Sequence, residues 1–293
     1  MRWDEGRQST NIEDRRGSSP VRRGIFGGGI GLVILVLIGM FFGIDPRVMM
    51  GLGTVADRVI PQKEAAPGPA PGEAGRPDPD AQMKQFVAYV LGDTEETWNA
   101  IFRQAGKQYQ EPKLVLFSGA AQSACGFAQA ATGPFYCPAD QKVYIDLAFY
   151  RDLQDRFKAP GDFAQAYVIA HEVGHHVQNL LGIADQVRQM QQRVGEREAN
   201  QLSVRMELQA DCLAGVWANH ANKARKVLEQ GDIEEGLNAA AQIGDDRMMK
   251  RSQGYVVPDA FTHGSGEQRV RWFKRGLQTG SVSQCDTFAV AQL

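Results

Sequence analysis

The amino-acid sequence predicts a mainly helical α+β fold, with a small β-sheet or hairpin before one long amphipathic helix and a transmembrane helix near the N-terminus. Two observations carry this prediction. Apolar residues recur at helical spacing from residue 162 to residue 181, and residues 25–44 contain no charged side chain. With 43% hydrophobic residues in a chain of 293, the protein can build a sizeable core. Its net charge of -2 gives no reason to expect a nucleic-acid partner.

Composition divides the chain into four segments. Residues 1–24 hold six arginines and few apolar side chains, which predicts a disordered basic tail. Residues 25–44 are uncharged, whereas residues 45–80 are rich in proline and glycine and are expected to form an extended linker. The folded domain is therefore expected to cover residues 81–293.

The uncharged stretch at residues 25–44 is long enough to cross a lipid bilayer as one helix. A small-residue cleavage site does not follow it, so we expect an uncleaved anchor rather than a signal peptide. Six arginines precede the stretch, and three basic residues follow it between positions 45 and 64. This asymmetry predicts a single-pass protein with a cytoplasmic N-terminus and the folded domain outside the cytoplasmic membrane.

At the start of the domain, the sequence predicts two helices followed by a β region. The helices are expected at Asp80–Leu91 and Asp93–Ala105, because Asp93 and Glu96 have the spacing of a capping box. Runs of β-branched and aromatic residues then predict a strand and a hairpin, whose strands are Lys113–Phe117, Phe135–Cys137 and Lys142–Asp146.

The long amphipathic helix is expected at Asp162–Leu181, with its first residue as the N-cap and Gln165 completing a capping box. It carries the pattern His-Glu-x-x-His at His171, Glu172 and His175. Residues four apart lie on one face of a helix, so the two imidazoles can bind a single ion, and zinc suits such ligands. Glu172 lies about 100° round the helix, where it can act as general base on a metal-bound water. A structural metal is the weaker alternative, because structural zinc usually has four Cys or His ligands.

A catalytic zinc ion usually has three protein ligands and one open position, so a third ligand is needed. The best source is a helical region from Asp185 to about Ala221, with a break near Gly195. Within it, Glu207 and Asp211 share one face because they are four residues apart. We expect Glu207 to be the ligand and Asp211 to accept a hydrogen bond from a ligating histidine. The alternative is that both carboxylates are solvated.

Two motifs, HEVGHHVQNLLG and MELQADCLAGVWA, carry a resemblance to a known family. With SACGFAQAATGPFYCPADQKVYID, NAAAQIGDDRM and FTHGSGEQRVRWFKRG, they make the domain similar to bacterial neutral zinc metallopeptidases, membrane-anchored relatives of the gluzincin group that contains thermolysin. The resemblance implies a zincin-like fold and a zinc metalloendopeptidase with one catalytic zinc ion. It maps the zinc ligands onto His171, His175 and Glu207, and the aspartate that orients a ligand onto Asp211. It also places the expected anchor in a bacterial inner membrane, with a periplasmic or otherwise extracytoplasmic domain.

The same resemblance implies how a peptide or protein substrate is bound and cleaved. A strand before the zinc helix pairs with the extended substrate, and Val143–Asp146 is the candidate, although it could also be an ordinary strand. Glu172 takes a proton from the zinc-bound water, which attacks the peptide bond, and then returns the proton to the leaving amine. The alternative function is a non-catalytic, membrane-tethered binding or scaffold domain whose metal is structural or a relic.

Four cysteines allow three disulfide pairings. We favour Cys125 with Cys137, which is a local pair beside the hairpin, and Cys212 with Cys285. An extracytoplasmic domain would favour their oxidation. The alternative is that Cys212 is a fourth zinc ligand or a buried thiol.

Three histidines lie outside the His-Glu-x-x-His pattern. By their rotation around their helices, His176 and His220 point away from the metal and are expected to be structural. His263 precedes the capped helix start formed by Ser265 and Gln268. It could stabilise the oxyanion of the transition state, replace Glu207 as third ligand, or serve in capping and packing; Tyr255 is a weaker candidate for the oxyanion.

Another helix is expected from Asp232 to about Met249, capped by Glu235. It carries the acidic pair Asp245 and Asp246, which is typical of a solvated surface and less often of a calcium site.

Overall fold

A computed structural model of the chain describes residues 1–4, 6–17, 78–129 and 133–293. Within these ranges, Met1–Ser18 and Pro79–Leu293 form one compact unit. None of the helices in the described ranges has the length and apolar character needed to pass through a bilayer. The predicted span at 25–44 and nearly all of the predicted linker lie outside the described residues.

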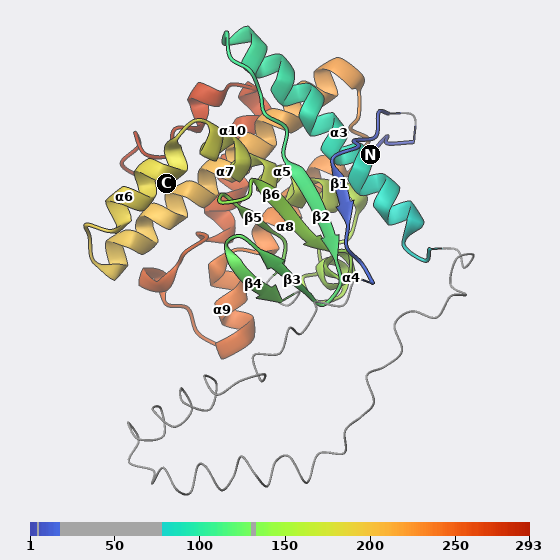
Figure 1. Cartoon of the computed structure of the whole chain (residues 1–293). Helices are drawn as coiled ribbons and strands as arrows, with labels where there is room; N and C mark the ends of the chain where they lie inside the picture. Colours follow the sequence, from blue (N-terminus) through green and yellow to red (C-terminus); the bar gives the residue numbers. More distant parts are fainter. Residues whose placement is uncertain (5, 18–77, 130–132) are drawn as a thin grey trace, which may run out of the picture. The chain divides into compact units, whose positions relative to one another are not determined.

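A four-stranded mixed sheet has the order β1-β2-β6-β5 (Figure 1). Strands β1 and β6 run parallel to the β2 strand between them, and β5 runs antiparallel to β6. The strands span Ile12–Asp14 (β1), Lys113–Phe117 (β2), Phe135–Cys137 (β5) and Lys142–Asp146 (β6). The strand and hairpin predicted from the sequence are thus confirmed, and β1 is an addition from the chain's first residues.

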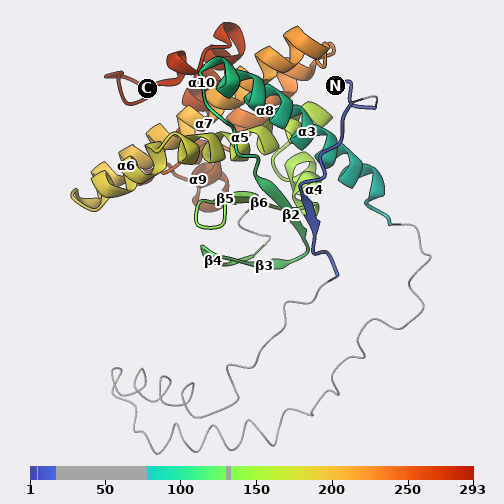
Figure 2. The ribbon, with the colours of Figure 1, turned by 45° about the horizontal axis from the view of Figure 1, so that its top comes forward.

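The sheet packs on both faces, because successive side chains of a strand point in opposite directions. Leu114, Leu116, Val143 and Ile145 point into the core formed with the helices. On the opposite face lie Val115, Phe117 and Tyr144, next to the two-stranded sheet of β3 (Ala120–Ser123) and β4 (Gly126–Gln129). Figure 2 shows this small sheet on the side of β2, β5 and β6 that faces away from the helices.

The helices follow the strands along the chain, except for one that precedes β2. They are α3 (Ala81–Gln104), α4 (Ala148–Asp155), α5 (Asp162–Leu180), α6 (Ile183–Gln191), α7 (Glu196–Arg225), α8 (Asp232–Gln242), α9 (Asp245–Gln253) and α10 (Gly266–Thr279), with short 3-10 turns η2 (Pro258–Ala260) and η3 (Val282–Cys285).

The helix α3 is one continuous helix, so the prediction of two helices divided near Asp93 is wrong. Asp93 does not cap a helix. Its buried carboxylate accepts a hydrogen bond of 2.7 Å from the Trp217 indole and forms an ion pair with Arg225. A buried carboxylate needs such partners, and they come from α7, more than 120 residues further along the chain.

Two other helix boundaries differ from the prediction. The helix expected over residues 232–249 is interrupted at Gly244 and becomes α8 and α9. The helix α5 starts after Gly161, whose φ of 117° favours glycine, and the carboxylate of Asp162 does not cap it. That carboxylate instead lies 2.7 Å from the amino group of Met1. The break near Gly195 between α6 and α7, and the capping box of Ser265 and Gln268 at the start of α10, are confirmed.

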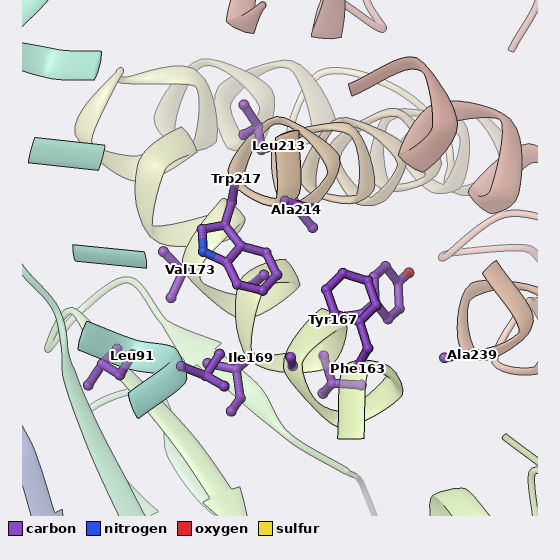
Figure 3. Packing of buried hydrophobic residues seen from close by; sticks show 14 of the residues in the cluster. Leu91, Phe163, Tyr167, Ile169, Val173, Leu213, Ala214, Trp217 and Ala239 are labelled. Carbon is purple, nitrogen blue, oxygen red and sulfur yellow. The ribbon is translucent and has the colours of Figure 1, made fainter. Parts of the chain in front are cut away.

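Helix α5 lies in the middle of the core (Figure 3). Phe163 stacks on Trp217 of α7 with ring centroids 5.9 Å apart, and Tyr167 meets Phe273 of α10 edge-on at 5.1 Å. Each of these four side chains is almost completely buried, and burying a large side chain stabilises a fold by about 1.5–3 kcal/mol. These contacts fix α5 against α7 and α10.

The structure contains both disulfides of the favoured pairing, Cys125–Cys137 and Cys212–Cys285. The first joins the loop after β3 to β5, and the second joins α7 to η3. Cys212 is therefore neither a metal ligand nor a free thiol.

The first residues of the chain belong to the folded unit, so the expected disordered tail is wrong for the described residues up to 17. Strand β1 extends the sheet beside β2 (Figure 1). Arg7 pairs with the buried carboxylate of Glu95 on α3, and the Met1 amino group lies within 3.3 Å of Asp232. A compositional signal of disorder fails here because the arginines meet carboxylates of the domain.

Helices α7 and α10 approach closely at Gly276. A Cβ atom added there would overlap the Cys212 carbonyl oxygen of α7. We expect Gly276→Ala to lower the free energy of unfolding by about 1–3 kcal/mol, because backbone atoms cannot move aside locally. Thermal unfolding of the purified protein would show this as a lower melting temperature. Gly195→Ala is the control, since a Cβ there meets nothing within 4 Å. Equal melting temperatures for the two variants would contradict the close helix contact.

Candidate metal centre

The two imidazoles of α5 face the same side of the helix. The ring centroids of His171 and His175 lie 4.8 Å apart, one helical turn along the axis. His171 is buried, and the side chain of His175 keeps 18% of its surface exposed. The pair thus lies at the floor of a cavity that remains open to solvent.

Helix α7 brings a carboxylate to this pair because a glycine lets it approach. A Cβ at Gly174 would lie 3.0 Å from the carbonyl oxygen of Ala210 and 3.3 Å from its Cβ, tighter than normal packing allows. At this approach, the Glu207 carboxylate of α7 lies 3.1 Å from Nε2 of His171 and 3.4 Å from Nε2 of His175. The structure therefore brings together the three ligands expected from the sequence.

The spacing of these atoms fits one tetrahedral metal ion. Ligand atoms bound at about 2.0–2.1 Å in a tetrahedron are separated by about 3.3 Å. The observed separations of 3.1 and 3.4 Å match this value, and ligand atoms of all three residues lie within 4.8 Å of one another. Two imidazoles and one carboxylate are also the donor set of catalytic zinc sites with an open fourth position.

Each histidine is oriented by a hydrogen bond at its other ring nitrogen. Nδ1 of His171 lies 2.8 Å from the Asp211 carboxylate, and Nδ1 of His175 lies 2.8 Å from the side-chain oxygen of Gln178. With a proton held at Nδ1, the lone pair of Nε2 points toward Glu207 and the metal position. Asp211 thus has the position expected of the outer carboxylate, and Gln178 plays the corresponding part for His175.

Arg269 is a member of the site that the sequence analysis did not identify. This buried side chain of α10 donates from Nε and Nη2 to the two oxygens of Asp211, both at 2.9 Å, and lies 3.3 Å from the Tyr167 hydroxyl. The sequence held one signal for this role, because Arg269 lies at helical spacing with Trp272, Phe273 and Gly276 on the buried face of α10. A charge on an apolar face usually has a buried partner.

The charges of the site favour a bound cation. Burial lowers the pKa of His171, but Asp211 and Glu207 outweigh that effect and raise it to about 10. Burial raises the pKa of Glu207, yet the two histidines hold it well below its usual value. For Asp211 the effect of burial is outweighed in the same way, first by Arg269, so its pKa is lowered. Two buried carboxylates therefore remain ionised beside the imidazoles and favour positive charge at Nε2, which a metal ion would supply in place of the proton.

Glu172 lies in the same cavity, away from the ligand row. Only 7% of the surface of Glu172 is exposed to solvent. Burial raises its pKa above the usual value, although the neighbouring histidines lower it in part. A carboxylate whose pKa is raised above its usual value is better suited to accept a proton.

The cavity is a cleft of about 460 Å³ that is lined by the three expected metal ligands and Glu172. Phe135 and Tyr136 of β5 form part of its wall. The prediction that Val143–Asp146 pairs with a substrate is wrong, because β6 lies between β2 and β5 and is paired on both sides. In the described part of the sheet, β5 is the outer strand next to the cleft.

His263 lines the cleft and is held by Asp245. The Asp245 carboxylate accepts backbone hydrogen bonds from Thr262, His263 and Gly264 at 2.6–3.0 Å and lies 3.1 Å from Nδ1 of His263. His263 is not in the ligand cluster, which Glu207 completes. Neither Asp245 nor Asp246 belongs to a cluster of possible metal ligands in the described part of the chain. The carboxylate of Asp246 instead accepts a hydrogen bond of 2.8 Å from the backbone N–H of Gly266.

The remaining histidines are structural, as their helical positions predicted. His176 is buried and bonds the Tyr136 hydroxyl at 3.0 Å, which ties α5 to β5. His220 lies 2.8 Å from the carbonyl oxygen of Gly280. Tyr255 is 63% exposed and does not line the cleft.

A mixed α+β fold with a His, His, Glu cluster at the floor of an open cleft defines a mononuclear metal site of the kind found in metallohydrolases. Comparison with known proteins agrees with that class. The chain belongs to the family described as "putative neutral zinc metallopeptidase", whose sequence profile matches residues 1–288. The family implies zinc, and the donor set described above fits that ion.

Two relatives extend over most of this chain. It is 50% identical over 296 residues to the uncharacterized protein YpfJ of Escherichia coli, covering 98% of this chain and 99% of the relative. It is 37% identical over 265 residues to the uncharacterized protein Rv2575 of Mycobacterium tuberculosis, covering 87% and 86% of the two chains. No solved structure matches the chain.

The hydrogen bond from His171 to Asp211 makes a prediction about metal affinity. We expect Asp211→Asn to weaken zinc binding about 10–100-fold, because the amide is a weaker acceptor and leaves Arg269 without its ion pair. Competition with a chromophoric chelator would measure the affinity, and circular dichroism would check folding. Asp185→Asn is the matched control, since that carboxylate is exposed on α6. Unchanged affinity in Asp211→Asn would show that the bond does not tune the site.

Proposed function

We propose that the protein is a zinc-dependent peptidase that hydrolyses peptide bonds within polypeptide substrates. The observation that carries this proposal is the combination, in one open cleft, of a His, His, Glu ligand set with a glutamate that is not a ligand. A structural metal site has no use for that extra carboxylate. When bound, zinc supplies Lewis acidity toward a water molecule and toward the scissile carbonyl.

Glu172 moves the proton in this proposal. Its carboxylate takes a proton from the attacking water and later gives it to the nitrogen of the leaving amine. Burial raises the pKa of Glu172, so its carboxylate accepts the proton of the attacking water more readily. General acid–base catalysis of this kind contributes about 10²–10⁴-fold to a rate.

His263 stabilises the negative charge that develops on the carbonyl oxygen. Asp245 holds the loop through three backbone bonds and keeps a proton on Nδ1 of His263, so Nε2 is directed away from Asp245. In the neutral ring Nε2 then lacks a proton, and only the imidazolium donates from that atom. The hydrogen bond with Asp245 is the main reason that the pKa of His263 is raised, and the imidazolium therefore persists to higher pH.

The substrate lies along β5 with a bulky apolar side chain in the cleft. As the outer strand, β5 can pair with an extended peptide through main-chain hydrogen bonds. Phe149 of α4, Phe157 in the loop after it, Val168 of α5 and Met248 of α9 line the cleft with apolar surface. The rings of Phe149 and Phe157 have centroids 6.1 Å apart, so they form one aromatic wall.

Glu172→Gln separates catalysis from metal binding. We expect the variant to keep its zinc and to lose about 10²–10⁴-fold in kcat, since the amide cannot accept the proton. Glu207→Ala is the companion variant, which loses both zinc and activity because a ligand is missing. Metal analysis and cleavage of a mixture of internally quenched peptides, with and without a chelator, provide the measurements.

The same experiment tests the alternative of a non-catalytic binding domain. If the zinc-loaded wild-type protein shows no peptide cleavage that a chelator abolishes, the peptidase proposal is wrong. If Glu172→Gln cleaves peptides as fast as the wild type, the assignment of the general base is wrong and another group takes the proton.

The Asp245 and His263 pair makes a prediction about pH. Activity that needs the His263 imidazolium is present at low pH and is lost as the pH rises through the raised pKa of this residue. Asp245→Asn removes the negative partner, so we expect the alkaline limb of the kcat/KM profile to move to lower pH. The asparagine oxygen can still accept the backbone bonds of the loop.

Asp259→Asn is the control for this profile, because that carboxylate is exposed and pairs with Arg197 outside the cleft. An alkaline limb at the same pH in Asp245→Asn and wild type would mean that His263 does not act as a charged donor.

A further inference from the structure

The outer surface of α3 is covered by the first residues of the chain. The backbone N–H of Ser9 donates to the carbonyl oxygen of Ala88 at 2.8 Å. The ring of Trp3 meets Phe86 edge-on with centroids 5.5 Å apart. These contacts fix the segment along the helix through both polar and apolar groups.

A completely buried carboxylate on α3 depends on this segment. Glu95 has 0% of its surface exposed, and its hydrogen-bond partners among the described residues are Arg7, Ser9 and Asn11. The Ser9 hydroxyl donates at 2.6 Å and the Asn11 amide at 2.8 Å. The segment therefore provides all three hydrogen-bond partners that this buried carboxylate has in the described structure, and a buried carboxylate without partners is unfavourable.

A glycine in the middle of α3 has the same explanation. A Cβ atom at Gly92 would lie 2.6 Å from the carbonyl oxygen of Arg7 and 3.0 Å from the backbone nitrogen of Ser9. Glycine destabilises the interior of a helix relative to alanine. Its presence here is therefore explained by the backbone of the segment, which leaves no room for a side chain.

The segment then continues into the sheet as β1. The backbone N–H of Leu114 donates to the Asn11 carbonyl at 2.8 Å, and Glu13 forms ion pairs with Lys142 at 2.8 Å and with Lys113 at 3.6 Å. Strand pairing and ion pairs thus join residues that are about 100 or more positions apart in the chain.

All four arginines within residues 1–17 have carboxylate partners within this unit. Arg7 pairs with Glu95 and Glu96, and the others pair with acidic residues of the segment and the domain: Arg2 with Glu229, Arg15 with Glu13, and Arg16 with Asp14. These ion pairs within the folded unit explain the four arginines. Their positive charge is therefore no longer evidence for a cytoplasmic N-terminus.

We infer that residues 1–17 are a built-in part of the folded domain and lie on the same side of the membrane as residues 79–293. A chain that crossed a bilayer once between these two parts would put about 30 Å of hydrocarbon between β1 and β2, which are paired. The inference excludes the expected arrangement in which the parts before and after residues 25–44 lie on opposite sides of a membrane. It does not depend on the proposed peptidase activity.

The experiment uses the full chain in bacterial cells. Gln8→Cys in the segment and Gln189→Cys on α6 each place a cysteine at an exposed position, while the native cysteines form disulfides. A membrane-impermeant maleimide is added to cells with a permeabilised outer membrane, and to a second sample after lysis. We expect both variants to be labelled under the same condition. Labelling of one in intact cells and of the other only after lysis would overturn the inference.

Gly92→Ala tests whether the segment packs on α3, through the direction in which the melting temperature changes. If the segment lies on α3, the added methyl group displaces it and the melting temperature of the purified full chain falls. If the segment does not lie there, alanine favours the helix and the melting temperature stays the same or rises. Either of the last two results would overturn the inference, whichever way peptide cleavage turns out.

Discussion

The close crossing of α5 and α7 at Gly174 is the contact on which the metal centre depends. Because this residue has no side chain, the backbone at Ala210 can lie against it. Glu207 and Asp211 are one turn apart on α7, so the same crossing delivers both. Glu207, the expected third ligand, lies 3.1 Å from Nε2 of His171, and Asp211 lies 2.8 Å from Nδ1 of the same residue. A single packing contact therefore sets the ligand and its orienting partner together.

The second constraint is the balance of buried charge behind the ligands. Asp211 is completely buried, and burial alone would favour its neutral form. Arg269 keeps it ionised through two hydrogen bonds of 2.9 Å, and the Tyr167 hydroxyl donates to the same carboxylate. An ionised Asp211 in turn keeps the Nδ1 proton of His171 in place. The chain of contacts runs from α10 through α7 to α5, so the third helix also shapes the metal centre although it provides no ligand.

Sequence reasoning identified what depends on spacing within one helix. The pairs His171 with His175 and Glu207 with Asp211 follow from the helical repeat, and their meeting in space agrees with it. It misjudged α3, because Asp93, which follows Gly92, has the spacing of a capping box with Glu96. The physical reasons for both residues lie elsewhere in the chain: the backbone of Arg7 requires the glycine, and α7 provides the partners of Asp93. Such partners cannot be found from local pattern.

The order of the strands shows the same limit, and the proposed mode of substrate binding depends on it. The hairpin of β5 and β6 could be predicted, but not which of the two would pair with β2 and leave the other at the edge. Pairing of β2 with β6 leaves β5 beside the cleft, where Tyr136 is held by His176 of the metal-binding helix. The next residue after His175 on α5 therefore positions the outer strand. Helix α5 thus carries the two candidate ligands and also holds β5, the strand proposed to bind the substrate, so a shift of α5 would move both together.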